Sequence, residues 1–314
     1  MKNVESQPST GKTFKILSID GGGIRGIFPA AYLNYLVQKL GDPRQIRSHF
    51  DLLAGTSTGG IIVLALALDL PLAKILDLYR NASHKIFRKS LSSIFCGIIA
   101  PKYDSEDLIG ELKQAFGEMK LKDSKSFLCI PSVDVLTGKP RVFKTPHSKE
   151  FVNDLNLFAW QVAAATSAAP GYFTPYHDET IGMHVDGGLW GNNPSLIGIA
   201  EAIRLGYKPH EIKILSIGTG SKPIYRNRLL LKHFGLAGWG LKLIDLTFQT
   251  QSQAASNISN YLCGPNYKRI DVVLPHSKYA LDNVKNANEL EHLATQKAME
   301  TYVEIQNQFF NGDN

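Results

Sequence analysis

The sequence predicts an α/β fold in which a mostly parallel central sheet is sandwiched between helices. Short apolar runs typical of buried strands alternate with longer segments typical of helices. At two positions, 20–26 and 55–60, a glycine-rich turn stands between an apolar run and a helical segment. Strands that alternate with helices favour a parallel sheet covered on both faces.

The N-terminal elements follow this alternation. Residues 14–19 are a short apolar run bounded by glycine, which predicts a buried strand, and 27–40 carry the apolar stripe of a helix. Residues 50–54 predict a second buried strand. The helix expected at 59–68 is apolar nearly all round, so it should lie within the core. A further helix is expected at 72–82.

The middle of the chain adds a hairpin between two helices. Residues 105–116 predict a helix with Ser105 as its N-cap. Two strands, at 127–135 and 140–145, are expected to pair across the short turn between them. An alanine-rich helix is expected at 157–169, where Pro170 and Gly171 end it.

The remaining elements return to strand and helix in turn. A strand at 181–185 leads into Asp-Gly-Gly, and a helix is expected at 194–205. Strands are expected at 212–217 and 269–274, and a closing helix at 287–310.

The chain is expected to form one domain, because it contains no internal repeat, low-complexity tract or linker. We assign residues 1–314 to a single domain, with a motif core at about 14–220. The basic, helical region 221–314 should pack on that core. A net charge of +6 is compatible with anionic partners but identifies none.

Composition also indicates the compartment. The three cysteines, Cys96, Cys129 and Cys263, are far apart, which favours a reducing compartment over a disulfide framework or a zinc site. The polar segment 1–12 does not resemble a signal peptide. The longest apolar run, 61–68, extends only to Leu72 with Asp69 inside it, which is shorter than the roughly 20 residues that span a membrane. We therefore expect a cytoplasmic protein.

Ser57 lies in the segment Gly55-Thr56-Ser57-Thr58-Gly59-Gly60. The Gly-x-Ser-x-Gly spacing is that of a nucleophile elbow, in which Gly55 and Gly59 let a strand and a helix pass close to a strained serine. A helix-capping serine in a tight turn is the alternative. The strand before it and the helix after it favour Ser57 as a nucleophile.

A second glycine-rich segment, 20–26, follows the first strand. Its three glycines, Gly21, Gly22 and Gly23, let backbone N–H groups approach a substrate oxygen at a helix N-terminus, which predicts an oxyanion hole. Arg25 is interpreted as pinning this loop or adding positive charge, with a surface arginine as the alternative.

The spacing Gly21-x-Gly23-x-x-Gly26 also matches a dinucleotide-binding fingerprint. That fold requires a second strand that ends in an acidic residue about 20 positions further on. Asp42 has about this separation but lies in a turn, so the oxyanion interpretation fits better.

A serine nucleophile needs a base. None of the nine histidines has a glycine-framed context, whereas Asp186 ends an apolar strand and precedes Gly187-Gly188. A carboxylate at the end of a strand in an α/β fold points into the crevice where ligands bind. An aspartate that caps a turn is the alternative.

Three motifs in this order carry a family resemblance. They are Asp-Gly-Gly-Gly-x-Arg-Gly at 20–26, Gly-x-Ser-x-Gly at 55–59, and Asp-Gly-Gly at 186–188 with Trp-Gly-Asn-Asn-Pro at 190–194. From about Lys15 to Gly220 the chain resembles the patatin-like phospholipase family.

The resemblance implies a patatin-like three-layer fold and a Ser–Asp dyad in place of a triad. Ser57 would be the nucleophile and Asp186 its proton acceptor, with Gly21 to Gly23 and Arg25 as the oxyanion loop. The reaction implied is hydrolysis of fatty-acyl esters of membrane phospholipids through an acyl-enzyme, with no metal or other cofactor.

Within the family, segments 16–30 and 55–62 are similar to bacterial patatin-type effectors of cyclic-oligonucleotide antiphage defence. This implies activation by a cyclic dinucleotide from a partner nucleotidyltransferase, and peripheral action on the inner membrane. No nucleic-acid partner is expected, and the oligomeric state is left open. Six residues could hold such a ligand through their cationic and aromatic side chains: Lys222, Tyr225, Arg226, Arg228, Lys232 and His233. For each of them, the alternative is an ordinary surface residue exposed to solvent.

Two segments, 86–103 and 229–242, mix bulky apolar residues with cations, as interfacial elements do. We expect at least one of them to form a lid or a membrane-docking surface. A core-facing amphipathic helix is the alternative for each.

Two other functions remain open from the residues alone. The first is a triad esterase or acyltransferase of the α/β-hydrolase type, and the second is a non-enzymatic nucleotide-binding module that uses the Gly21 loop. A triad would need a histidine after the acid, and the candidates are His210, His233, His276 and His292.

Overall fold

A computed structural model describes residues 12–41, 43–87, 100–148, 151–222, 239–275 and 279–311. In this part of the chain, eight strands form one sheet in the order β5-β6-β3-β2-β1-β7-β8, and β4 pairs with β3. The strands are β1 (Phe14–Ile19), β2 (Leu52–Gly55), β3 (Phe127–Asp134), β4 (Lys139–Lys144), β5 (Tyr176–Asp178), β6 (Gly182–Asp186), β7 (Ile212–Ile217) and β8 (Tyr267–Ile270).

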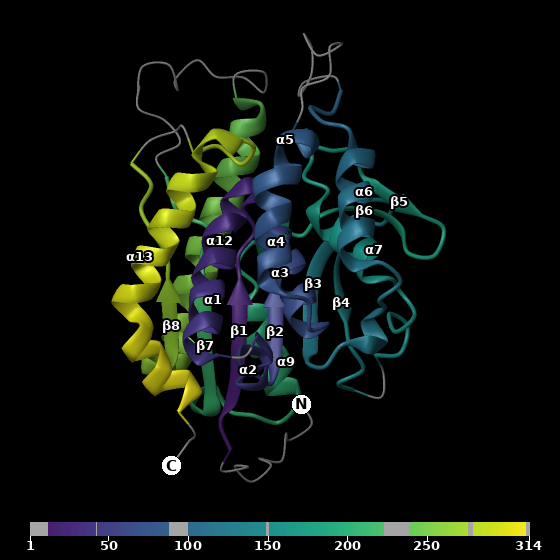
Figure 1. Cartoon of the computed structure of the whole chain (residues 1–314). Coiled ribbons are helices and arrows are strands. Elements are labelled where there is room, and N and C mark those ends of the chain that lie inside the picture. The colour runs from purple at the N-terminus through teal and green to yellow at the C-terminus, as the bar shows by residue number, and fades with distance from the viewer. Residues whose placement is uncertain are drawn as a thin grey trace.

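The five strands β3, β2, β1, β7 and β8 are parallel to one another. Their carboxyl ends point to the top of Figure 1. β4 and β6 run antiparallel to β3, and β5 runs antiparallel to β6. The prediction of a mostly parallel α/β sheet is therefore confirmed.

Helices cover both faces of the sheet, which gives three layers. In Figure 1, α13, α1 and α4 lie in front of the strands, and α12 and α9 lie behind them. The helices are α1 (Ile27–Leu40), α2 (Pro43–Ser48), α3 (Thr58–Ala67), α4 (Leu72–Asp77), α5 (Ser83–Ile86), α6 (Ser105–Phe116), α7 (Ala159–Ser167), α8 (Gly188–Gly191), α9 (Ser195–Arg204), α12 (Leu241–Cys263) and α13 (Ala287–Ile305). Short 3₁₀ segments are η1 (Gly23–Gly26), η4 (Leu121–Asp123), η5 (Pro209–Glu211), η6 (Gly264–Asn266) and η7 (Val284–Asn286), and π-helical segments are η2 (Leu78–Ala82) and η8 (Gln306–Phe310).

The two-residue period of β1 divides its side chains between the layers. Leu17 and Ile19 belong to the larger core under α1, α3 and α13, whereas Phe14 and Ile16 belong to the smaller core under α9. A central strand buried on both faces reads as a continuous apolar run, which is why 14–19 could be recognised from the sequence.

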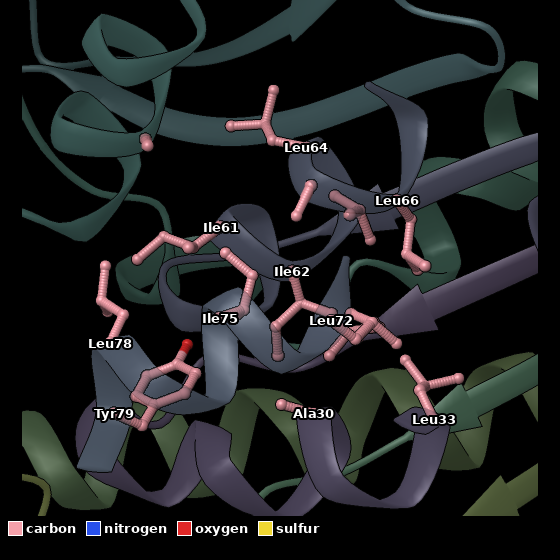
Figure 2. Close-up of a cluster of buried hydrophobic side chains, with 14 of the residues drawn as sticks. Ala30, Leu33, Ile61, Ile62, Leu64, Leu66, Leu72, Ile75, Leu78 and Tyr79 are labelled. Atoms are coloured by element: carbon pink, nitrogen blue, oxygen red, sulfur yellow. The ribbon is translucent and has the colours of Figure 1, made fainter. Parts of the chain in front are cut away.

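Helix α3 is buried on every side, as its all-apolar sequence predicts. Figure 2 shows Ile61 and Ile62 of α3 close to Ile75 and Leu72 of α4, with Ala30 of α1 nearby. A helix enclosed in this way holds its first residue rigidly. The turn that enters α3 contains Ser57.

Several details differ from the sequence-based expectation. The N-cap of α6 is Asp104, whose side chain accepts a hydrogen bond from the Glu106 amide, so the assignment of Ser105 was wrong. The helix expected at 72–82 changes to a π-helix at Leu78, and the short strand β5 was not predicted. The spacing of apolar residues along the sequence indicates neither of these two features.

No helix in the described residues combines the length and the apolar character that crossing a bilayer requires.

We expect Ile62→Ala to lower the free energy of unfolding by about 2–5 kcal/mol, because the side chain is fully buried and its loss leaves a cavity. Urea denaturation followed by circular dichroism measures the change. The control is Leu136→Ala in the β3–β4 turn, where the leucine is 72% exposed and the denaturation midpoint should not move. Equal shifts in the two variants would contradict the assignment of the core.

Candidate active site

Two strands share one edge of β3 and meet end to end there. β2 pairs with Phe127 to Cys129, and β6 pairs with Ser132 to Asp134, while β4 occupies the opposite edge. Because β2 runs parallel to β3 and β6 runs antiparallel, the carboxyl ends of β2 and β6 face each other. The chain leaving β2 carries Ser57, and the last residue of β6 is Asp186.

The backbone at Ser57 is strained. Its φ of 53° and ψ of −123° fall in a region that residues with a side chain rarely adopt. The glycines on either side allow a close approach, since a Cβ on Gly55 would lie 2.3 Å from the Gly59 carbonyl oxygen, and a Cβ on Gly59 would lie 2.2 Å from that of Ile19. This is the geometry of a nucleophile elbow.

Asp186 is fully buried. Its Oδ1 accepts a hydrogen bond from the Gly188 amide at 2.7 Å, and its Oδ2 accepts none from the part of the chain that the structure describes. Burial raises the pKa of this carboxyl to about 7, and interactions with the Ser57 hydroxyl and the Gly188 amide oppose the rise. A carboxyl with this pKa can take up and release a proton near neutral pH.

The end of α7 holds the two halves of the site together. Thr166 accepts a hydrogen bond from the Ser57 amide at 2.9 Å and donates one to the Pro131 carbonyl at 2.6 Å. The carbonyl groups of Thr166 and Ala168 accept bonds from the amides of Gly187 and Asp186, at 3.3 Å and 3.0 Å. Sequence reasoning missed Thr166, because a threonine in an alanine-rich helix carries no local signal.

Three backbone amides of the glycine loop and of the start of α3 have no hydrogen-bond acceptor among the described residues: those of Gly22, Gly23 and Thr58. The predicted loop residue Gly21 differs, because its amide donates to the Asn192 carbonyl at 3.0 Å and is not available to an oxyanion. Thr58 follows the serine, which is where one oxyanion donor of a nucleophile elbow comes from. It was not among the predicted residues.

Arg25 pins the glycine loop. The buried guanidinium donates from Nη1 to the Gly220 carbonyl at 2.8 Å and from Nε to the Gly22 carbonyl at 3.5 Å. Since these bonds fix the backbone on both sides of the loop, the pinning role is the one that the geometry favours. The surface-arginine alternative is wrong.

Asp20, at the start of the same loop, forms a buried ion pair with Arg269 of β8. The guanidinium donates to both oxygens of Asp20, at 2.8 and 2.7 Å, and to Asp271 at 2.7 Å. Burial raises the pKa of Asp20, and Arg269 opposes the rise. A residue far along the chain therefore anchors the glycine loop.

A narrow apolar cavity opens beside Ser57. Its volume is about 50 Å³, and its walls come from Gly23 and Ser57 together with residues of α3, η2, α6 and the segment after α7. The Ser167 hydroxyl in this wall is buried and has no hydrogen-bond partner among the described residues. By its lining, the cavity suits an alkyl chain, but it is too small to hold a long one.

No described histidine lines the cavity at Ser57 or shifts the pKa of Asp186. His184, two residues before Asp186, directs its ring to the Ser132 hydroxyl and the Ile181 carbonyl. His210 and His292 are exposed, and His233 and His276 lie outside the described residues.

One group of side chains has the composition of a metal site. Single ligand atoms of Cys129, His147 and Glu201 lie within 4.8 Å of one another. Lys144 and His147 both pair with the Glu201 carboxylate, so the carboxylate already has cationic and hydrogen-bonding partners. We interpret the group as a structural ion-pair cluster.

Of the predicted ligand-binding residues, the structure describes Lys222. Lys222 is buried, and its ammonium group pairs with Asp245 at 2.6 Å. The alternative that Lys222 is a surface residue exposed to solvent is therefore wrong. Tyr225, Arg226, Arg228, Lys232 and His233 lie outside the described residues, as do most of the proposed lid segments 86–103 and 229–242.

Comparisons with known proteins agree with the motifs. Residues 17–198 match the family model of patatin-like phospholipases. A cGAMP-activated phospholipase of Pseudomonas aeruginosa is 33% identical over 289 residues, covering 90% of this chain and 84% of the relative. One from Vibrio cholerae is 32% identical, covering 90% and 88%. Patatin-like protein 4 of Arabidopsis thaliana is 30% identical, covering 90% and 84%.

Hydrolysis of a soluble short-chain ester should rise with pH and level off above about pH 7. A base acts in its ionised form, and the pKa of Asp186 is raised to about 7. The pH profile of kcat/KM with p-nitrophenyl butyrate measures this. Asp186→Asn should abolish the activity, whereas His210→Ala and His292→Ala should retain it. A profile that depends on either histidine would favour a triad.

The same carboxyl should make the folded protein less stable as pH rises. Between an unfolded pKa of about 3.9 and the folded value of about 7, the native state holds a proton that the unfolded state has released, so stability falls across this window. We expect Asp186→Asn to melt at a higher temperature than the wild type at pH 8, with the gap closing towards pH 4. Calorimetry measures it, and a constant gap would count against the raised pKa.

Thr166→Val should lower kcat by about 10²-fold with little change in KM, because the Ser57 amide and the Pro131 carbonyl lose their shared partner. Thr166→Ser keeps the hydroxyl and should restore most of the rate. If both variants lose activity equally, the methyl group is the important part and the hydrogen-bond assignment fails. The pH profile should keep its midpoint in both variants, since Asp186 remains.

Proposed function

Because the chain belongs to the patatin-like phospholipase family, we propose that Ser57 and Asp186 form the catalytic dyad of a lipid acyl hydrolase. The family match identifies the chain as an enzyme of this class. The dyad is our assignment, and it rests mainly on the buried Asp186 carboxyl beside Ser57, with its pKa raised to about 7.

In the proposed mechanism, Asp186 takes the proton from the Ser57 hydroxyl as the oxygen attacks the carbonyl carbon of a lipid ester. The amides of Gly22, Gly23 and Thr58 stabilise the negative charge on the carbonyl oxygen. The tetrahedral intermediate then collapses, and the lysolipid leaves with the proton from Asp186. Asp186 next takes a proton from a water molecule, whose oxygen attacks the acyl carbon. Asp186 returns that proton to the Ser57 oxygen as the bond between Ser57 and the acyl group breaks and the fatty acid is released.

The direction from which Asp186 arrives supports this role. β6 runs antiparallel to β3, so Asp186 at its carboxyl end faces the end of β2, from which the chain continues to Ser57. A triad esterase is less well supported, because the described histidines near the sheet are committed to other partners.

Activation by a cyclic dinucleotide is the second part of the proposal. Relatives from Pseudomonas aeruginosa and Vibrio cholerae bear the name cGAMP-activated phospholipase. The cavity of about 50 Å³ at Ser57 supports a resting state that must open before it can hold an acyl chain. We propose that a partner nucleotidyltransferase supplies the ligand and that the enzyme then acts peripherally on the inner membrane.

Vesicles of phosphatidylglycerol or phosphatidylethanolamine test the whole proposal. We expect the protein to release fatty acid when cGAMP is added, at least tenfold faster than without it, and Ser57→Ala to release none. Liquid chromatography with mass spectrometry quantifies the products. Full activity without a nucleotide would reject the switch but retain the hydrolase, and activity in Ser57→Ala would reject the dyad.

A further inference from the structure

A polar cavity of about 480 Å³ lies on the other side of the glycine loop from the apolar cavity. Gly23 and Ser57 face the apolar cavity, whereas the side chains of Asp20 and Arg25 line the polar one. Its volume falls within the range of small-molecule sites. The mechanism described above leaves this cavity without a role.

The cavity has walls from two parts of the chain. One wall comes from the loop residues and from Asn192, within the segment 17–198 that the family model matches. The other comes from later elements, including β8 and a polar face of α12. The α12 residues are Gln249, Thr250, Ser252, Gln253 and Ser256. A ligand in this cavity would contact both the segment matched by the family model and the later elements β8 and α12.

The lining suits a phosphodiester that carries bases. Arg25 and Arg269 bring two guanidinium groups, which bind phosphate oxygens through charge-assisted hydrogen bonds. The amides and hydroxyls of α12 supply donors and acceptors of the kind that base edges need. Asp20 and Asp271 pair with Arg269, so an incoming phosphate would compete with them for its donors.

Helix α12 contacts both halves of the catalytic centre. The Ser252 hydroxyl accepts a hydrogen bond at 2.8 Å from Asn192, which also donates to the Gly21 carbonyl of the glycine loop. Phe248 packs against Gly188, so that a Cβ there would lie 2.8 Å from its ring. The Gly188 amide is the donor to Asp186. A displacement of α12 would therefore reach the loop and the base together.

We propose that this cavity is the binding site of the nucleotide activator, and that the bound phosphodiester adjusts the glycine loop through Arg25 and Arg269. The inference rests on the activation proposed above and adds its location. A ligand shifts a conformational equilibrium only if it binds one state more tightly. Here the tighter state is the one in which a phosphate oxygen replaces Asp271 at Nη2 of Arg269, while Nη1 keeps its bond to Asp20.

The test measures cGAMP binding to the full chain by isothermal titration calorimetry, together with the ratio of vesicle hydrolysis with and without cGAMP. Gln253→Leu removes an amide from the cavity wall, and Thr250→Trp places a large ring at its rim. We expect each to raise the Kd at least tenfold and to lower the activation ratio. The matched control is Gln251→Leu, which makes the same change on the same helix outside the cavity and should behave like the wild type.

The outcomes separate the two proposals. If the wild type binds cGAMP and all three variants bind it equally well, the location is wrong and the activation stands. If the wild type binds no cGAMP at millimolar concentration, the activation proposal is wrong and the proposed location is wrong with it.

A second experiment uses glycerophosphoglycerol, a phosphodiester with the headgroup of a lipid. Binding of this headgroup in place of cGAMP, lost in Gln253→Leu, would assign the cavity to substrate and overturn the inference. Melting curves of each variant confirm that it is folded.

Discussion

The whole site depends on how one edge of β3 is shared. β2 occupies the first half of that edge and β6 the second half, running in opposite directions, so their carboxyl ends meet in the middle of the sheet. No loop has to carry the serine or the aspartate to the other. A change in the length of either strand by a single residue would turn a side chain to the wrong face. The register of a buried strand thus sets the distance between Ser57 and Asp186, the proposed nucleophile and base.

Burial at this meeting point has opposite effects on chemistry and on stability. Removing water from Asp186 weakens it as an acid and so makes it a usable base near neutral pH, but ionising it there costs folding free energy. The surrounding structure offsets that cost through the all-apolar helix α3 and the hydrogen bonds from the end of α7. The strained serine has the same support, because only a rigid turn maintains a positive φ at a residue with a Cβ.

The sequence predicted the fold well because the buried strands are continuous apolar runs and their turns are marked by glycine. It indicated Ser57 and Asp186 through motifs that can be read locally. It did not indicate Thr166 or Arg269, whose roles come from hydrogen bonds to residues far away in the chain. Thr58, which directly follows the serine, was also missed, although the nucleophile-elbow motif places an oxyanion donor at that position. The sequence placed Asp186 at the carboxyl end of a strand in an α/β fold without giving the direction of that strand, and β6 runs antiparallel to β3. Whether a strand runs parallel or antiparallel is defined by its neighbours in the sheet, so the sequence of one strand does not determine it.

The ion pair between Asp20 and Arg269 has a consequence for biosynthesis. The ribosome adds Ser57, the glycine loop and Asp186 well before it adds Arg269, and domains tend to fold as they emerge. Until Arg269 arrives, Asp20 has no cation of this kind and the loop lacks its anchor, since a buried charge without its partner is costly. A nascent or prematurely terminated chain would then carry all three sequence motifs on a glycine loop that lacks this ion pair.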